Sequence, residues 1–271
     1  MKEIARIEEI TGCKNLVLLE VGMSTTKFKG IYKGKPILVR RFHERDYYGN
    51  RFKRENFILK FLENISNSNL VFPKIIKEFP DHDIHVLSWI EGESLDNVAI
   101  SETKKYEIVK SIWETITKLP EPNDFKFNHF RDIRMLTEDE SKIMNISKTI
   151  FLNLKDKIWK SFNKSIIKKH SRSIIHGDLH DGNIIVINLE KNQFGVIDWE
   201  FASIGSKYFD LAYYCTYSNR DYPSEYLDEM RPWEDIIKLL ITHWFLSNFD
   251  NYPSEAKQWL DTLRKEIMVS T

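Results

Sequence analysis

The chain has 271 residues and carries 40 basic and 40 acidic side chains, so its formal net charge is zero. This balance gives no electrostatic reason to expect a nucleic acid as a partner. Hydrophobic residues make up 42% of the sequence and charged residues 30%, as in globular proteins. No run is apolar over the roughly 20 residues that a membrane span needs, so we expect no membrane partner.

The two cysteines and the N-terminus indicate a cellular location. Cys13 and Cys215 lie far apart without a C-x-x-C pattern, which predicts neither a disulfide framework nor a zinc knuckle. The first ten residues include acidic side chains and lack the apolar core of a signal peptide. We therefore expect a cytoplasmic protein, and the sequence leaves its oligomeric state open.

The first ninety residues predict a helix followed by short strands. Ile4, Ile7 and Ile10 recur at helical spacing before Gly12, a residue type that often ends helices. The runs that follow are rich in strand-forming residues and are separated by turn residues. They cover residues 16–21, 28–32, 37–42, 74–79 and 84–89.

The other predicted elements are mostly helices. Apolar spacing indicates one helix at 52–62 and another that begins after Ser101, a good N-cap, and ends before Pro120. Further helices are predicted from the apolar stripe of Leu154, Ile158, Phe162 and Ile166 and from the patterns at 233–249 and 256–267.

Polar side chains gather in one short connection between two apolar runs. The connection carries His176, Asp178, His180, Asp181 and Asn183. After the second run and a turn, a further strand-like run ends on the carboxylate of Asp198. Polar loops between buried strands are frequent sites of binding and catalysis, so these residues form the candidate site.

The pattern His-Gly-Asp-x4-Asn at 176–183, followed by Val-Ile-Asp-Trp-Glu at 196–200, resembles the aminoglycoside phosphotransferase and choline kinase superfamily. These are small-molecule kinases whose fold is similar to that of protein kinases. The resemblance implies an α+β, two-lobed protein-kinase-like fold, with a small antiparallel β N-lobe that carries one main helix and a larger, mostly helical C-lobe. It implies a nucleotide-binding N-lobe at 1–90 and a catalytic and substrate-binding C-lobe at 91–271.

The same resemblance implies a phosphotransferase with an alcohol group as acceptor, ATP as phosphoryl donor and Mg2+ as cofactor. Asp178 would orient the acceptor hydroxyl and take its proton, and Asn183 and Asp198 would hold the metal. Ser24, in the turn after the first strand, would face the nucleotide phosphates. Asp210 would support the catalytic loop, although a role as a helix N-cap explains it almost as well.

The third strand departs from the kinase pattern, in which a lysine holds the phosphates. Arg40 occupies that position, or Arg41 if the register shifts by one residue, and Glu55 on the following helix is the expected partner. Arginine keeps the charge but is longer, planar and bidentate. In relatives, adenine binds the backbone of the segment that joins the lobes, which here would involve Ser88 and Ile90.

The stretch from Asp198 to Asp235 carries nine acidic residues against three basic ones and is rich in aromatic rings. In relatives, the segments after the second metal ligand build the acceptor pocket. Acids beside aromatic faces favour a cationic ligand, so we expect a small cationic alcohol, aminoglycoside-like ahead of choline-like. The same residues would equally suit a solvated surface and a filled core.

Two other functions account for part of the pattern. His176, Asp178, His180 and Asp181 could together coordinate zinc in a metallohydrolase, but that function leaves Asn183 and the later carboxylates unused. A catalytically weak or inactive nucleotide-binding module would explain the arginine on the third strand. A kinase uses all the patterned residues and is therefore the function that we expect.

Overall fold

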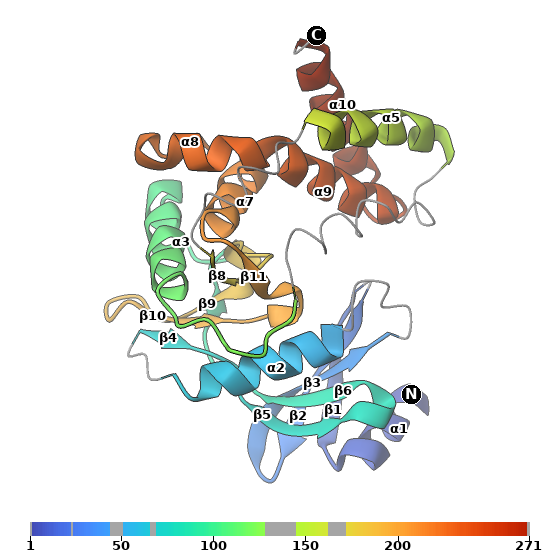
Figure 1. Cartoon of the computed structure of the whole chain (residues 1–271). Helices are drawn as coiled ribbons and strands as arrows, with labels where there is room; N and C mark the ends of the chain where they lie inside the picture. Colours follow the sequence, from blue (N-terminus) through green and yellow to red (C-terminus); the bar gives the residue numbers. More distant parts are fainter. Residues whose placement is uncertain are drawn as a thin grey trace. The chain divides into compact units, whose positions relative to one another are not determined.

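The computed structural model of the chain describes residues 2–22, 24–43, 51–65, 69–127, 145–161 and 172–269 (Figure 1). The chain divides into two compact units. The first unit contains Met1–Ile112, Pro122–Phe125 and Asp181–Ala202, and the second contains Trp113–Glu121, Lys126–His180 and Ser203–Thr271. The division of nucleotide binding and substrate binding near residue 90 is a functional boundary and stays a prediction.

An antiparallel sheet dominates the first unit and runs in the order β1-β2-β3-β6-β5. Its strands are β1 (Lys14–Val21), β2 (Thr25–Tyr32), β3 (Lys35–Phe42), β5 (Ile75–Phe79) and β6 (Ile84–Ser88). The unit also contains α1 (Lys2–Thr11), α2 (Arg51–Glu63) and the short 3-10 helix η1 (Pro80–His82). The strands that the sequence predicts for this sheet are present, with ends that differ by a few residues.

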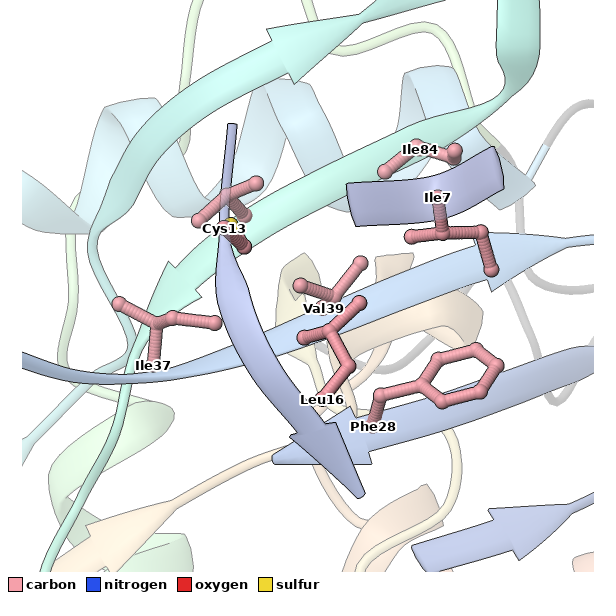
Figure 2. Packing of buried hydrophobic residues seen from close by; sticks show 8 residues of the cluster. Ile7, Cys13, Leu16, Phe28, Ile37, Val39 and Ile84 are labelled. Carbon is pink, nitrogen blue, oxygen red and sulfur yellow. The ribbon is translucent and has the colours of Figure 1, made fainter. Parts of the chain in front are cut away.

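One face of this sheet is apolar, because successive side chains of a strand point to opposite sides. Phe28 on β2 lies opposite Val39 on β3, which lies opposite Val86 on β6. Figure 2 shows Ile7 of α1 among these sheet residues, so α1 helps to cover the apolar face. The buried cluster consists of Ile7, Cys13, Leu16, Phe28, Ile37, Val39, Ile84 and Val86.

The opposite face of the same sheet is polar and charged. Lys27 lies opposite Arg40, and Arg40 lies opposite His85, so one row of polar side chains crosses β2, β3 and β6. α2 lies beside the sheet (Figure 1), and its Glu55 contacts both Arg40 and His85. The part of α2 that carries Glu55 is therefore buried in the protein and is not a solvated helix face.

A smaller sheet of the first unit runs in the order β4-β10-β9-β7. Its strands are β4 (Leu70–Val71), β7 (Glu93–Ser94), β9 (Ile184–Asn188) and β10 (Gln193–Val196). The sequence does not predict β4 and β7, because two residues are too few for a periodic pattern. Gly92, just before β7, has φ +151°, and a Cβ there would lie 2.5 Å from the carbonyl oxygen of Val186. Only glycine permits this close approach of β7 to β9.

In the second unit, β8 (Arg172–Ile175) pairs with β11 (Ser203–Ser206) in antiparallel fashion. The unit contains α5 (Asn145–Ser161), α7 (Phe209–Tyr217), α8 (Leu227–Met230), α9 (Glu234–Ser247) and α10 (Pro253–Val269), with the 3-10 helices η4 (Ser224–Tyr226) and η5 (Arg231–Trp233). Phe162 and Ile166, from the helical stripe that the sequence predicts, lie outside the described residues.

The helix α3 (Glu102–Ile116) begins in the first unit and ends in the second. Ser101 caps it as predicted, because its Oγ accepts a hydrogen bond from the backbone N–H of Lys104 (3.2 Å). The antiparallel five-stranded sheet, the smaller sheet in which β4 and β10 run parallel, and the helices together confirm the predicted α+β class. Within the ranges that the structure describes, no helix is both long and apolar enough to cross a membrane.

Ile37 and Ile31 lie on neighbouring strands but differ in burial, which gives a matched test of the apolar face. Ile37 is 0% exposed and Ile31 is 42% exposed. We expect Ile37→Ala to lower the free energy of unfolding by about 2 to 5 kcal/mol, because it removes buried carbon and leaves a cavity. Ile31→Ala should cost less than about 1 kcal/mol. Urea denaturation measures both, and equal losses would show that this face is not a closed core.

Candidate active site

The polar loop connects two different sheets. β8, on its N-terminal side, pairs with β11 in the second unit, and β9, on its C-terminal side, pairs with β10 in the first. Just before β9, η2 (Asp181–Asn183) forms a single 3-10 turn. Asp178 therefore belongs to the second unit and Asn183 to the first.

Asp210 braces the loop from α7. Its carboxylate accepts hydrogen bonds from the backbone N–H groups of His176 (2.7 Å) and Gly177 (2.8 Å). Gly177 has φ +85°, in the left-handed region that glycine adopts without strain. Burial raises the pKa of Asp210, although the charge of His176 and the two N–H groups act in the opposite direction. Asp210 thus supports the loop, and the N-cap position of α7 belongs to Tyr208.

Asp178 lies in the braced part of the loop, with a half-buried carboxylate. Its backbone N–H donates to Nδ1 of His176 (3.3 Å), and its Oδ2 lies 3.7 Å from Nε2 of His180. The hydroxyl of Tyr213, also on α7, forms a hydrogen bond with the Asp178 side chain. Burial and the negative charge of Asp178 raise the pKa of Tyr213 well above its usual value, so the phenol stays protonated and donates to the carboxylate.

Asn183 and Asp198 lie at the same end of the β9-β10 hairpin. Asn183 directly precedes β9, and Asp198 follows β10 and precedes the 3-10 helix η3 (Trp199–Phe201). The backbone N–H of Ile197 donates to the carbonyl oxygen of Asn183 (3.0 Å), which fixes the two segments together. Asp198 has φ +67°, a conformation that is uncommon outside glycine and that clusters at functional sites.

Arg40 lies at the centre of a buried ionic network. Its guanidinium contacts the carboxylates of Glu55, Asp198 and Glu200, with 2.5 Å between Nη2 and Glu200 Oε2. The pair of Arg40 and Glu55 that the sequence suggests is therefore present, and both side chains are buried. Arg41 forms an exposed ion pair with α1 instead, so the register of β3 is not shifted.

Glu55 and Glu200 each have further partners in the first unit. Nδ1 of His85 lies 3.0 Å from Glu55, and Nη1 of Arg51 lies 2.9 Å from Glu200. Ser24 donates its hydroxyl hydrogen to Glu200 as well (2.9 Å). Burial raises the pKa of Glu200, although the neighbouring arginines oppose this shift. The role of Ser24 toward nucleotide phosphates stays a prediction.

Lys27 of β2 is a second cation beside Asp198. Its Nζ lies 3.1 Å from Oδ2 of Asp198 and 2.9 Å from Oε2 of Glu20. Arg40 contacts the other carboxylate oxygen of Asp198. Burial alone would raise the pKa of Asp198, but the charges of Arg40 and Lys27 outweigh burial and hold that pKa well below its usual range. Asp198 is therefore an anion at physiological pH.

Ser88 is the last residue of β6, and Ile90 lies between β6 and β7. The backbone N–H of Ser88 donates to the carbonyl oxygen of Lys74, and its Oγ accepts from the backbone N–H of Lys74, both at 2.8 Å. The side chain of Ile90 packs against β10, where a Cβ on Gly195 would come within 2.8 Å of it. The structure thus orders this segment, and its contacts with adenine stay a prediction.

The zinc alternative has no support in the described part of the chain, where no group of three or more His, Cys, Asp or Glu side chains could hold a metal ion. His176 is buried and contacts the loop backbone through Nδ1. The metallohydrolase function is therefore set aside.

The sequence assigns no individual role to five residues that the structure places in these contacts, namely Lys27, Arg51, His85, Glu200 and Tyr213, although Glu200 ends the Val-Ile-Asp-Trp-Glu motif and Tyr213 belongs to the aromatic stretch after Asp198. Lys27 and His85 become recognisable once the strand register is known, because both lie opposite Arg40. Tyr213 follows Asp210 by three residues, a spacing that places both on one side of a helix and that the sequence does contain. No local pattern indicates the partners of Arg51 or Glu200.

Comparison with known proteins gives a family and a fold. The model of the phosphotransferase enzyme family matches residues 16–235, which is most of the chain. A protein named LicA homolog from Metamycoplasma hominis is 26% identical over 241 residues, which cover 82% of this chain and 89% of that protein.

Solved structures of small-molecule kinases share the fold. The choline kinase LicA from Streptococcus pneumoniae matches with a TM-score of 0.66 and 16% identity, over 98% of both chains. A thermostable mutant of the aminoglycoside phosphotransferase APH(4)-Ia, in ternary complex with AMP-PNP and hygromycin B, matches with a TM-score of 0.65 and 15% identity, over 96% of both chains. These matches confirm the kinase-like fold that the sequence predicts. Because the family model spans the polar loop, the hairpin and most of the remaining chain, the protein belongs to the phosphotransferase enzyme family.

Proposed function

We propose that this enzyme transfers the γ-phosphoryl group of ATP to the hydroxyl group of a small cationic alcohol and uses Mg2+ as cofactor. The observation that carries the proposal is the polar loop. Asp210 holds the loop at His176 and Gly177, and the loop then continues directly into the hairpin whose end bears Asn183 and Asp198. Phosphoryl transfer requires a catalytic carboxylate and oxygen ligands for a metal, and one continuous stretch of the chain carries all three side chains.

We assign Asp178 to the acceptor hydroxyl. Its backbone is fixed by His176, and Tyr213 donates to its carboxylate, so the side chain has a defined direction. A carboxylate in this position accepts the hydrogen of the incoming hydroxyl and orients its oxygen. Good orientation supplies roughly 7 to 11 kcal/mol of a barrier, whereas general-base catalysis supplies about 10²- to 10⁴-fold in rate. Orientation is therefore the larger contribution of Asp178.

We assign Asn183 and Asp198 to Mg2+. An amide oxygen and a carboxylate are hard oxygen ligands of the kind that Mg2+ selects. Each oxygen of Asp198 accepts one hydrogen bond, from Arg40 or from Lys27, and a carboxylate oxygen has a second lone pair for a metal. When bound, Mg2+ neutralises charge on the phosphate oxygens. The protein's own part is to keep Asp198 ionised and in place.

We assign the nucleotide to the first unit. AMP-PNP, the ligand of the aminoglycoside phosphotransferase with this fold, is an ATP analogue and supports ATP as the donor. Ser88 and Ile90 would receive adenine, and Ser24, Arg40 and Glu55 would lie toward the phosphates. A cytoplasmic location is consistent with a reaction that consumes ATP. It is also consistent with the two cysteines, which are both free and buried.

Some of the acidic residues after β10 have structural roles. Asp198 and Glu200 contact Arg40, and Asp210 braces the loop. Tyr214 and Trp233 are buried and fill the core. The case for a polycationic acceptor, which rested on the number of acids in this stretch, is therefore weaker than composition alone suggests.

Aromatic rings beside Asp178 favour a choline-like acceptor. Tyr213, which contacts Asp178, stacks on Tyr217 with 6.1 Å between ring centroids and 7° between planes. Tyr217 is partly exposed and lies 5.7 Å from the ring of His180. Aromatic faces attract quaternary ammonium groups, which have no hydrogen to donate to a carboxylate. We therefore place a choline-like alcohol ahead of an aminoglycoside-like one, the reverse of the order expected from the sequence.

Binding of Mg-ATP should stabilise the folded protein. At a nucleotide concentration 100 times its Kd, we expect the free energy of unfolding to rise by about 2.7 kcal/mol. Thermal melting with and without Mg-ATP measures this effect, and ATP with a chelator in place of Mg2+ is the control. An unchanged melting temperature at millimolar Mg-ATP would count against a nucleotide site.

Asp178→Asn and Asp198→Asn should each reduce kcat by about 100-fold or more, because each removes a charge from the reacting site while nearly keeping side-chain shape. Asp156→Asn replaces an exposed carboxylate of α5. It is the matched control and should leave kcat unchanged. ATP consumption with a competent acceptor measures all three, and circular dichroism checks the fold. Full activity in folded Asp178→Asn would contradict the assignment.

A panel of hydroxyl compounds should separate the possible acceptor classes. We expect turnover with choline-like quaternary alcohols, weaker turnover with amino sugars, and none with neutral or anionic alcohols of similar size. ATP consumption confirmed by detection of the phosphorylated product is the measurement. Preference for a neutral or anionic acceptor would show that the rings beside Asp178 do not select a cation.

A further inference from the structure

β3 carries an arginine at the position where kinases carry a phosphate-binding lysine, and β2 carries a lysine directly opposite it. In the β2-β3 register Lys27 pairs with Arg40, so the two side chains share the charged face of the sheet. Both contact Asp198, one on each carboxylate oxygen. Asp198 therefore contacts two cations, which differ in their surroundings.

Arg40 is held in place by buried ion pairs with other side chains of the protein. It is 2% exposed, and its two terminal nitrogens contact Glu55, Asp198 and Glu200. Moving it toward a phosphate would leave these buried carboxylates without their cation, and breaking a buried pair is strongly destabilising. Arg40 is thus the residue that orients Asp198, and it is poorly suited to follow a ligand.

Lys27 is much less constrained. Its side chain is 22% exposed, and its second partner, Glu20, is 56% exposed. Exposed ion pairs contribute little to stability, so Lys27 can leave Glu20 at low cost. A lysine ammonium is a compact charge with three donors on a flexible stem. It can therefore keep its contact with Asp198 and direct another donor at a phosphate oxygen.

We propose that Lys27 is the residue that contacts the phosphates of the nucleotide, in place of the lysine that β3 lacks. The inference rests on the proposed function, because it names the cation within the same nucleotide site. In kinases with a lysine on β3, one residue contacts both the carboxylate and the phosphates, whereas here two residues would share these contacts. Arg40 fixes the acidic side chains, and Lys27 binds the anionic ligand.

Lys27→Met tests the proposal in the full chain. We expect the Kd for Mg-ATP to rise at least about 10-fold, the loss of one charge-assisted hydrogen bond, while the Kd for adenosine changes less than about twofold. Lys27→Arg should recover part of the affinity for Mg-ATP. Lys77→Met, which removes an exposed lysine from β5 of the same sheet, is the matched control and should bind both ligands as the wild type does. Equal weakening of Mg-ATP binding and adenosine binding in Lys27→Met, or no weakening of Mg-ATP binding, would overturn the proposal.

A second measurement needs no variant. In the wild-type protein, Mg-ATP should slow acetylation of Lys27 by an amine-reactive reagent, whereas adenosine should not, and Lys77 should react equally in both cases. Mass spectrometry of the digested protein reads each site. Equal reactivity of Lys27 with and without Mg-ATP would refute the contact even if Lys27→Met failed to fold.

The two hypotheses fail in different ways. A wild-type protein that binds no Mg-ATP, or an Asp178→Asn variant that keeps full activity, contradicts the proposed function itself. A wild-type protein that binds Mg-ATP and transfers phosphate, beside a Lys27→Met variant with the same Kd and KM for ATP, leaves that function intact and refutes only the role of Lys27.

Discussion

The buried guanidinium of Arg40 is the constraint on which the first unit depends. A charge inside a protein is costly unless it is paired and hydrogen-bonded. The carboxylates that contact Arg40 come from separate segments, since Glu55 belongs to α2, Asp198 to the end of the hairpin and Glu200 to η3. The large sheet, α2 and the β9-β10 hairpin therefore have to assemble around one side chain, and the order of the site is a consequence of folding.

The same network sets the state of Asp198. Two cations hold its pKa low, and they contact both of its carboxylate oxygens. Arginine suits this task because its planar fork bridges several carboxylates at once, which a lysine ammonium does with less geometric control. The presence of arginine in place of lysine on β3 thus favours an ordered arrangement of Glu55, Asp198 and Glu200 over a mobile cation at this position.

Much of the candidate site could be predicted from the sequence because its motifs are local. Asp178, Asn183 and Asp198 lie at fixed spacing in two short segments, and the resemblance to the kinase pattern of a strand lysine and a helix glutamate indicates Arg40 and Glu55. The partners of these residues depend on pairing between distant segments, which no local pattern encodes. Apolar runs likewise do not reveal that β8 and β9 belong to different sheets, although the elements themselves are predicted.

The polar loop is short and is held at both ends. Asn183 follows Asp178 by five positions, with four residues between them, so their Cα atoms cannot be more than about 18 Å apart in any conformation. Asp210 fixes the first end through two backbone N–H groups, and the hydrogen bond from Ile197 fixes the second through a carbonyl oxygen. Ordering a flexible residue costs about 1 to 2 kcal/mol of backbone entropy. Because these contacts form when the chain folds, the two ends of the loop are ordered before a substrate binds, and the orienting role that we propose for Asp178 depends on that order.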